Sequence, residues 1–512
     1  MASGYKDELN RIARGAGIIF GGRLASVALQ YLFVIVVSRG LGAASAGIFF
    51  LGFAIIGLAA VVGQMGLHSG VLRYVALYNG IGDGARVKGT IFTALRLAAG
   101  ASIFIGLVLF LKADFVSQSI FNKAGLLPVL RLFCMALPFL ALMIVLIHCI
   151  QGFQQMKYVV YVRDLLQPLI CLLGASVFIS LGFSVRGVVL SYIISVALGL
   201  ALAFFFLKVV FLKPIGAVKP TGETKKLLSY SFPLLLVTLL IFITQWVNIL
   251  MVGYFRPAQD VGVFNAAART AICLGIILVS FNTIFAPMIS DLYNRGEMER
   301  LAMLFKTVTR WVFVLSAPGF LLVVLLAKEI LAIFGTDFIA GWASLIILAG
   351  GQMVNASSGA VGYMLIMTGR QNVELFNSLG AATVNFILCY LLIPPYGIVG
   401  AAVATATTVV LLNLVRLMQV YALLGFHPYS VKFLKPFFSC IGAGIIIMLF
   451  KALGQGLSLG PLSLLAILVI VFMSIYFFFL RIMGLDEEDR IILQVVRSKI
   501  KGARQEGTGV EK

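Results

Sequence analysis

Long runs of apolar residues recur along almost the whole chain, and short polar or glycine-rich segments separate them. A helix needs about 20 mostly apolar residues to cross about 30 Å of hydrocarbon at a rise of about 1.5 Å per residue. By this rule the sequence predicts an all-α integral membrane protein with about 14 spanning helices. The first six are expected at residues 15–37, 46–67, 89–111, 130–151, 165–181 and 188–211. The others are expected at 232–254, 263–289, 309–327, 343–369, 373–392, 398–423, 433–450 and 461–480.

These runs divide the chain into five parts. Residues 1–212 hold the first six spans and form the expected N-terminal lobe, and a basic linker follows at 213–228. The next six spans form a C-terminal lobe at 229–424, and two further spans occupy 425–484. The tail at 485–512 begins with acidic residues, continues with an apolar stripe and ends with basic residues. This order predicts an amphipathic helix that lies on the inner membrane face.

The composition excludes an ordinary soluble protein. Apolar residues make up 61% of the chain and charged residues only 11%, against about half and about 25% in soluble domains. A net charge of +20 would suit nucleic acid, but most of the 39 basic residues fall in alternate loops once the N-terminus is placed inside. By the positive-inside rule both termini then face the cytoplasm, across the cytoplasmic (inner) membrane. The charge is therefore explained by orientation and by contact with anionic membrane lipids, and no nucleic-acid partner is expected.

The cysteines and the N-terminus do not add another function. The cysteines occur singly inside apolar runs, with no C-x-x-C pair and no histidine at ligand spacing, so we expect small buried hydrophobic residues and no metal site or cofactor. They are Cys134, Cys149, Cys171, Cys273, Cys389 and Cys440. The N-terminal residues lack a short apolar core followed by a small-residue cleavage site, so we expect no cleavable signal peptide.

The two groups of six spans look like copies of one unit. A shift of 215 residues places Gln30 on Gln245, and Gly47 with Ile48 and Phe49 on Gly262 with Val263 and Phe264. Six spans per copy restore the same sidedness, so the copies would be related by an axis along the membrane normal, as in secondary transporters with a site between two lobes. The repeat therefore predicts a central cavity between spans 1–6 and spans 7–12.

The segment SRGLGAASAGIFFLGFAIIGLAAVVGQMGLHSGVLRYVA at 38–76 resembles the first-hairpin signature of polysaccharide transporters and oligosaccharide flippases. These belong to the multidrug/oligosaccharidyl-lipid/polysaccharide (MOP) exporter superfamily. The similarity continues in FNAAART at 264–270 and APMISDLYNRGE at 286–297. The matching positions of the first segment are Arg39, Leu41, Gly42, Gly47, Gly66 and Arg73.

The resemblance implies a fold and a function. The fold would be the two-lobed inverted V of the MATE transporters, with 12 core spans and two extra C-terminal spans. The function would be transfer of an undecaprenyl-pyrophosphate-linked oligosaccharide from the inner to the outer leaflet by alternating access, for the biosynthesis of polysaccharide such as lipopolysaccharide. A polymerase and glycosyltransferases of the same pathway would then be partners.

Three arginines inside predicted spans are candidates for the cavity: Arg23 in the first, Arg96 in the third and Arg269 in the eighth. An arginine inside a span costs about 2.5 to 3.5 kcal/mol on insertion scales, so it is a candidate functional residue. A cavity with guanidinium groups would bind a pyrophosphate or acidic sugars through bidentate hydrogen bonds. We favour this interpretation for Arg23 and, with support from the resemblance, for Arg269. Arg96 lies near the cytoplasmic end of its span, where a side chain that reaches to the interface is the simpler interpretation.

Uncharged polar residues in the spans have two interpretations. They can bind sugar hydroxyl groups, or they can join helices by hydrogen bonds worth roughly 0.6 kcal/mol each. Gln30 and Gln245, which are equivalent in the repeat, are the best candidates for sugar contacts, and Asn248 is a further one. His68 and His148 lie near span ends and are expected at the interface rather than in a proton relay.

Two alternatives to an oligosaccharide flippase remain. A lipid II flippase would share the fold and an arginine-rich cavity. A MATE-type drug/cation antiporter would need a carboxylate buried at mid-span to bind a cation, and no Asp or Glu lies at the centre of a predicted span. An enzyme is not expected, because we find no catalytic carboxylate or histidine pair at a membrane face. The chain also has no G-x-x-x-x-G-K-[ST] motif for ATP, so a gradient would supply the energy.

Overall fold

A computed structural model describes the chain except for residues 1, 214, 217, 430–432, 454–460 and 483–512. Every element of the described chain is helical. Ten of these helices are long and apolar enough to cross a membrane. The predicted all-α membrane fold is therefore confirmed, whereas the count of 14 spans stays a prediction. The predicted tail helix at 485–512 lies outside the described residues.

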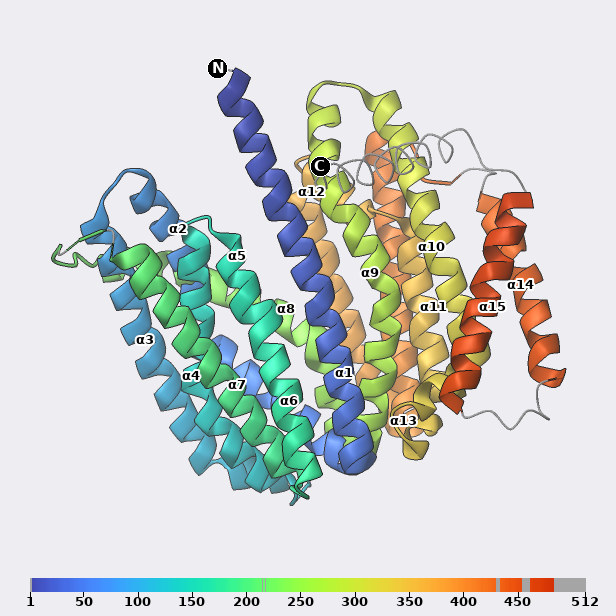
Figure 1. Cartoon of the computed structure of the whole chain (residues 1–512), viewed down its shortest axis with the longest axis horizontal. Coiled ribbons are helices and arrows are strands. Elements are labelled where there is room, and N and C mark those ends of the chain that lie inside the picture. Colours follow the sequence, from blue (N-terminus) through green and yellow to red (C-terminus); the bar gives the residue numbers. More distant parts are fainter. Residues whose placement is uncertain (1, 214, 217, 430–432, 454–460, 483–512) are drawn as a thin grey trace, which may run out of the picture. The chain divides into compact units, whose positions relative to one another are not determined.

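The first of two compact units comprises residues 1–269, 331–344 and 382–404. Helix α4 lies at its centre and packs against α1, α2, α3 and α7 (Figure 1). In its most apolar stretch 61% of α4 is buried, against 22% of α3, which leaves most of α3 free to face lipid. The elements are α1 (Ala2–Gly63), α2 (Leu67–Gly80), α3 (Gly84–Leu111), η1 (Phe115–Ile120), α4 (Leu126–Gly152), α5 (Met156–Val159), η2 (Val160–Leu166), α6 (Gln167–Ser180), α7 (Val185–Phe206), η3 (Leu207–Leu212) and α8 (Thr224–Phe255).

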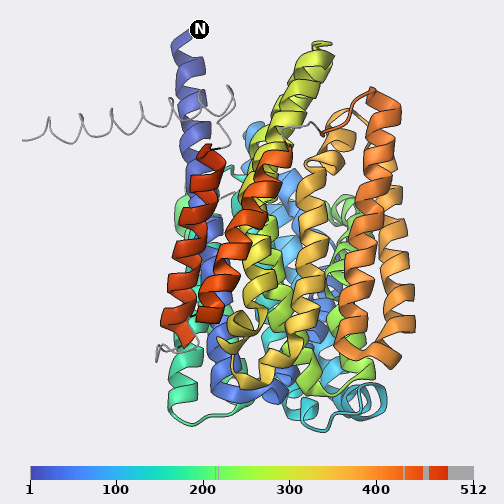
Figure 2. The same cartoon turned by 90° about the vertical axis from the view of Figure 1, so that its right-hand side faces the viewer.

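The second unit comprises residues 270–330, 345–381 and 405–512. Phe285, Phe305 and Met364 belong to one of its buried clusters. In a second cluster α15 contributes Phe472 and Tyr476, and the Tyr476 hydroxyl donates a hydrogen bond of 2.8 Å to the carbonyl oxygen of Val314. Figure 2 shows α14 and α15 side by side. The remaining elements of the chain are α9 (Ala258–Asn294), α10 (Met298–Ala332), η4 (Thr336–Gly341), α11 (Trp342–Ser358), α12 (Val361–Met367), α13 (Gln371–Leu424), α14 (Leu434–Leu453) and α15 (Pro461–Ile482).

Two of these helices each contain two predicted spans joined at a glycine. Gly42 has a φ of 76° inside α1, and Gly397 has a φ of 59° inside α13, just after Pro394 and Pro395. Glycine accepts a positive φ without steric cost, and proline removes a helical hydrogen bond. The chain can therefore turn back at the two places where the sequence predicts that one span ends and the next begins.

The second predicted span, 46–67, is broken near its end. Helix α1 ends at Gly63, Met65 and Gly66 have positive φ values of 51° and 69°, and α2 starts at Leu67. A Cβ atom on Gly66 would overlap the carbonyl oxygen of Ser231 and lie 2.8 Å from the amide nitrogen of Leu235. The break therefore lets the start of α2 approach the backbone of α8, a tertiary contact that the apolar pattern does not reveal.

Helices α1 and α9 cross backbone to backbone at equivalent positions of the repeat. A Cβ atom on Gly47 would overlap the carbonyl oxygen of Ala258 and lie 2.9 Å from the amide nitrogen of Gly262. A Cβ atom on Gly262 would overlap the carbonyl oxygen of Ala43 and lie 3.1 Å from the amide nitrogen of Gly47. Ala43 and Gly47 are related to Ala258 and Gly262 by the same shift of 215 residues, so the contact is reciprocal.

Candidate functional site

All six residues predicted for the cavity lie in the first unit. Arg269 on α9 and Asn248 on α8 are half-buried, whereas the other four are exposed. Those four are Arg23 and Gln30 on α1, Arg96 on α3 and Gln245 on α8. The contacts described below bring Arg269 and the middle of α8 together, and they do not include Arg23 or Arg96.

Arg269 lies over the indole ring of Trp246. The guanidinium carbon is 5.4 Å from the ring centroid, within the range of a cation–π interaction. Trp246 in turn stacks on Phe242 at 5.9 Å and packs against Phe53 at 5.4 Å. The arginine is therefore held on an aromatic surface that α1 and α8 build together.

Further aromatic side chains, from α7, α4 and α1, pack against this surface. Phe53 contacts Tyr192 of α7 at 5.3 Å, and Tyr192 contacts Phe133 of α4 at 5.8 Å. Phe133 and Phe49 are both fully buried and lie 5.5 Å apart. Because aromatic pairs in such edge-on and tilted arrangements add about 0.5–1.5 kcal/mol each beyond their burial, the ring under Arg269 has a fixed position.

This arrangement suits an anion with an attached sugar. A guanidinium group donates parallel hydrogen bonds to phosphate oxygens, and a neighbouring indole offers a flat face to the C–H side of a sugar ring. The sequence indicated Arg269 through its charge but not Trp246, which is one of only 3 tryptophans. Its position next to Gln245, a residue predicted from the repeat, was the available signal.

Two of the predicted polar residues have partners inside the first unit. The Gln30 amide donates a hydrogen bond of 3.0 Å to the hydroxyl of Ser26, one turn earlier on α1. The Asn248 carbonyl oxygen accepts hydrogen bonds from the Asn385 amide at 3.3 Å and from the Cys389 thiol at 3.0 Å. Asn248 therefore joins α8 to α13, which is the interhelical role that the sequence left open for it.

Two buried carboxylates are neutralised by arginines. Asp164 in η2 is paired with Arg163 at 2.9 Å, and Glu374 in the first turn of α13 is paired with Arg416. Their side chains are only about a tenth exposed. These two carboxylates lie at the start of the predicted spans 165–181 and 373–392, and because they are paired they do not offer an unpaired negative charge to a cation.

A cluster of tyrosines and charged residues connects α2 and α8 beside the linker. The Tyr78 hydroxyl donates a hydrogen bond of 2.6 Å to Glu223, and Lys226 is paired with Glu223 at 3.0 Å. Burial, together with the hydrogen bond to Glu223, raises the pKa of Tyr78, and the same hydrogen bond lowers the pKa of Glu223. The guanidinium of Arg73 lies 4.4 Å from the centroid of the Tyr230 ring. Arg73, which belongs to the family-like segment, therefore helps to hold α2 against α8.

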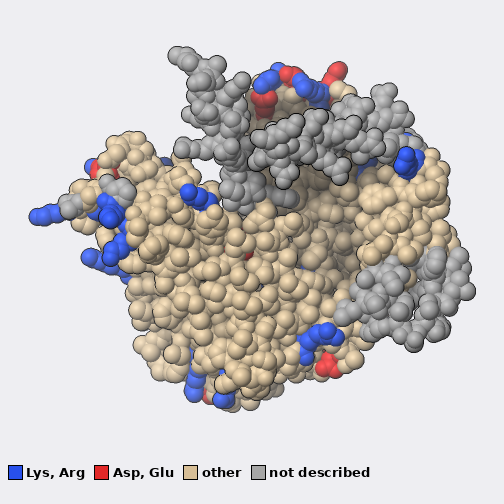
Figure 3. Space-filling model, in the orientation of Figure 1, with Lys and Arg blue, Asp and Glu red and all other residues tan. Residues whose placement is uncertain are grey.

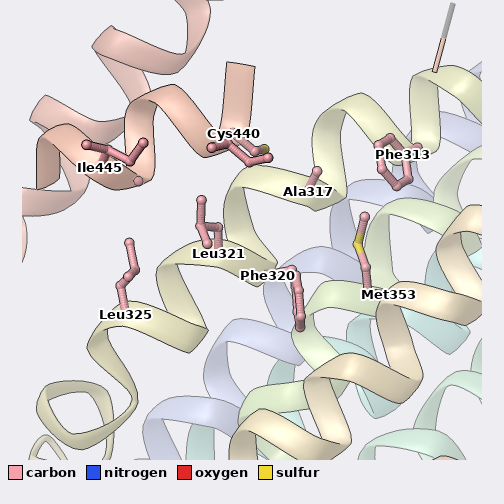
Figure 4. Close-up of a pocket in the computed structure, with 10 residues that line it drawn as sticks. Phe313, Ala317, Phe320, Leu321, Leu325, Met353, Cys440 and Ile445 are labelled. Atoms are coloured by element: carbon pink, nitrogen blue, oxygen red, sulfur yellow. The ribbon is translucent and has the colours of Figure 1, made fainter. Parts of the chain in front are cut away.

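The second unit contains an apolar pocket of about 380 Å³. Leu321 of α10 and Cys440 of α14 line it together with Met353 of α11, and none of its lining residues is charged (Figure 4). Such a pocket suits a hydrocarbon chain better than a polar group.

Charged side chains gather near the ends of the helices on the face shown in Figure 3, and the surface between them is nearly all uncharged. Many large apolar side chains of the described residues are exposed, including Phe104, Leu111 and Ile284, each of which is more than 65% exposed. Water would make such exposure costly, whereas lipid would not. This surface is that of a multi-pass membrane protein.

Comparison with known proteins gives two family matches and two relatives. Residues 12–293 match the family described as Polysaccharide biosynthesis protein, and residues 233–391 match the MatE family. Two proteins of Haloferax volcanii are similar in sequence. The first is a probable low-salt glycan biosynthesis flippase, Agl15, which is 25% identical over 77% of this chain and 80% of its own length. The second, a probable flippase called AglR, is 23% identical over 85% of this chain and 87% of its own.

Two solved structures share the fold. The lipid II flippase MurJ in an inward closed conformation has a TM-score of 0.70 and 15% identity, over 92% of this chain and 98% of that one. An inward-facing multidrug resistance transporter of the MATE family has a TM-score of 0.65 and 15% identity, over 78% of this chain and 94% of that one. The expected MATE-like fold is confirmed. Because the first family match alone covers more than half of the 512 residues, the chain belongs to the polysaccharide biosynthesis protein family of the MOP superfamily.

Proposed function

We propose that this protein is a flippase that carries an undecaprenyl-pyrophosphate-linked oligosaccharide across the cytoplasmic membrane for polysaccharide biosynthesis, by alternating access. The family match and the two relatives named as flippases support a transporter rather than an enzyme. The substrate, the inner membrane and the cytoplasmic position of both termini are parts of this proposal. A polymerase and glycosyltransferases of the same pathway would supply and use the lipid-linked sugar.

The contact between Arg269 and Trp246 carries the proposal. The two groups recognise the two parts of the substrate head, because the guanidinium fits a diphosphate and the indole face fits a sugar ring. Arg23 and Arg96 would add positive charge along the path, and Gln30 and Gln245 would bind sugar hydroxyl groups. A cationic drug would be repelled by such a path, so the same contact disfavours a drug antiporter.

The lipid part of the substrate needs an apolar environment throughout the cycle. The bilayer supplies most of it, since the carrier tail can stay in the hydrocarbon while the head crosses. The apolar pocket between α10, α11 and α14 offers room for part of a tail that lies against the protein. Ile445 in its wall makes this testable, because this side chain is exposed and Ile445→Trp would fill part of the pocket and compete with the tail.

The test is complementation of a strain that lacks the gene. Lipid-linked repeat units should accumulate in the inner leaflet, and the wild-type protein should clear them. We expect Arg269→Ala to lower the flipping rate at least tenfold and Arg269→Lys to recover only part of it, because lysine keeps the charge but loses the planar fork. Accumulation of lipid II in place of the oligosaccharide would identify the peptidoglycan precursor as the substrate and overturn the proposal.

Arg131 provides a matched control for these variants. Its guanidinium also lies over an aromatic ring in the first unit, 5.6 Å from the centroid of Phe110, but on α3 and α4 rather than beside Trp246. Arg131→Ala should therefore complement like the wild type. An equal loss in Arg131→Ala and Arg269→Ala would show that the two changes act through stability, and would contradict a substrate role for Arg269.

A further inference from the structure

Two of the three histidines of the chain face each other inside the first unit. His68 lies in the first turn of α2, just after the break at Gly66, and His148 lies in the last turns of α4. Their ring centroids are 5.1 Å apart in an edge-to-face arrangement. Thr238 of α8 completes the cluster, with its hydroxyl oxygen 3.4 Å from Nε2 of His68. The break in the predicted span thus places His68 where α2, α4 and α8 meet.

The hydrogen bonds around the pair indicate where each ring carries its proton. The Thr238 hydroxyl donates its single hydrogen to the carbonyl oxygen of Leu234, at 2.8 Å. Toward His68 it can then only accept, so Nε2 of His68 carries the ring hydrogen and Nδ1 carries the lone pair. Nδ1 of His148 lies 2.8 Å from the carbonyl oxygen of Ile144, which also only accepts, so His148 carries its hydrogen on Nδ1.

Nδ1 of His68 is buried and has no hydrogen-bond partner among the described residues. A buried polar atom without a partner costs about 1–3 kcal/mol, and nearly all buried polar groups in native proteins avoid this cost. A lone pair on an imidazole nitrogen that accepts no hydrogen bond is also a basic site that binds a proton. The fold therefore keeps an unsatisfied proton acceptor next to a second imidazole.

The surrounding charges limit the pair to a single proton. Two imidazolium rings at this distance repel each other, so a second proton binds at a lower pH than the first. The charged group that acts on the pair from its surroundings is Arg163 of η2, on the side of His148, and Arg163 is itself paired with Asp164. Helix α8 presents the neutral Thr238 to His68. The positive charge of Arg163 opposes a proton on His148 and is not among the charges that act on His68, so His68 is the favoured acceptor.

We propose that His68 and His148 form a binding site for one proton, with Nδ1 of His68 as the acceptor. The site lies at the break between α1 and α2 and touches α8, so protonation acts on the contact between α2 and α8. A transporter with no ATP-binding motif can use such a site to draw energy from a proton gradient. The proposal concerns proton binding alone and does not depend on the identity of the transported lipid.

The experiment is a pH titration of the full-length protein in lipid nanodiscs, with ¹⁵N-labelled histidine. The chain has only 3 histidines, so His68→Gln, His148→Gln and His427→Gln assign all the signals, and the exposed His427 serves as the reference. The nitrogen shifts report both the tautomer and the charge of each ring. We expect His68 and His148 together to take up one proton, with the second proton binding about one pH unit or more below the first.

Two variants make the test decisive. His148→Gln removes the neighbouring imidazole, so the titration midpoint of His68 should rise by about one pH unit. Thr238→Val keeps the shape of the side chain and both histidines but removes the acceptor for Nε2, so part of His68 should change to the tautomer with hydrogen on Nδ1. The proposal is overturned if neither ring takes up a proton between pH 4 and pH 8, if the midpoint of His68 is the same in His148→Gln, or if Thr238→Val leaves the tautomer unchanged.

Discussion

Trp246 fixes the position of the guanidinium group that the proposed function depends on. Its indole contacts the guanidinium of Arg269 and also packs against Phe53 and Phe242. Holding an arginine side chain in one place costs about 2 kcal/mol of conformational entropy. A rigid aromatic support that already restrains the side chain reduces the further entropy cost of substrate binding.

Replacing Trp246 tests this support. Trp246→Phe keeps a flat aromatic face, so we expect flipping within about threefold of the wild type, whereas Trp246→Ala should lower it at least tenfold. The measurement is the amount of lipid-linked repeat units cleared from the inner leaflet, normalised to protein in the membrane. Equal rates for the two variants would show that the aromatic face is not needed.

The sequence could indicate Arg269 but not its partner, for a physical reason. A charge inside an apolar span is rare because it is costly, so each one stands out. Aromatic residues carry no such cost in a membrane, and at 12% of this chain they form a background in which Trp246 is not distinctive. The site around His68 was equally hidden, because the side chains that contact its ring come from α4 and α8 and depend on how these helices pack.

Within single elements, α13 is held as a hairpin by polar pairs on its two halves. Glu374 accepts a hydrogen bond of 2.9 Å from Nε of Arg416, and Asn377 and Gln419 exchange amide hydrogen bonds of 2.6 Å and 2.9 Å. Both pairs join residues 42 positions apart, so they link the two halves of α13, which are joined at Gly397, at successive helical turns.

Breaking the ion pair should destabilise the protein. Glu374→Gln leaves Arg416 buried without its counter-charge, and such a loss typically costs about 3–5 kcal/mol. Thermal unfolding in detergent should show a clear decrease in Tm, which the double variant Glu374→Gln with Arg416→Met should largely reverse. Asp291→Asn is the matched control, because its partner Arg295 and Asp291 are both more than half exposed and should contribute less than about 1 kcal/mol.

The contact between α1 and α9 has no room for a methyl group. Gly47→Ala and Gly262→Ala should each force the two backbones apart and lower the Tm by several degrees, in line with an overpacking cost of about 1–3 kcal/mol. Gly100→Ala in α3 is the control, since a Cβ atom there meets nothing within 4 Å and alanine favours a helix. Unchanged melting of both contact variants would contradict the close approach.

At the scale of helices the apolar pattern was a reliable guide, except that two predicted spans, 46–67 and 343–369, are broken, the second between Ser358 and Val361. The turns at Gly42 and Gly397 fall where glycine and proline interrupt the apolar runs. The break at Met65 and Gly66 falls inside an apolar run because its cause is the backbone of α8, which is distant in sequence. The sequence therefore predicts the helix breaks that glycine and proline cause locally, whereas breaks that depend on a distant helix are seen only in the packed structure.

For the whole molecule, the sidedness proposed from the basic residues makes a prediction that needs no substrate. Ser184, between α6 and α7, should face outward, and Ser229, near the start of α8, should face the cytoplasm. Both side chains are exposed, and serine to cysteine changes little in size. An impermeant maleimide added to intact cells should label Ser184→Cys but not Ser229→Cys, and the reverse pattern would invert the topology.

The reciprocal contact between Ala43 with Gly47 and Ala258 with Gly262 has the form of a contact between two identical subunits. In a symmetric pair of subunits, a residue can touch its own copy only where the two-fold axis passes. Here a residue touches the equivalent residue of the other repeat, from the same backbone atoms in both directions. Two separate six-helix subunits related by a two-fold axis would make the same contact. The single chain therefore has, at one glycine pair, the geometry of a homodimer interface.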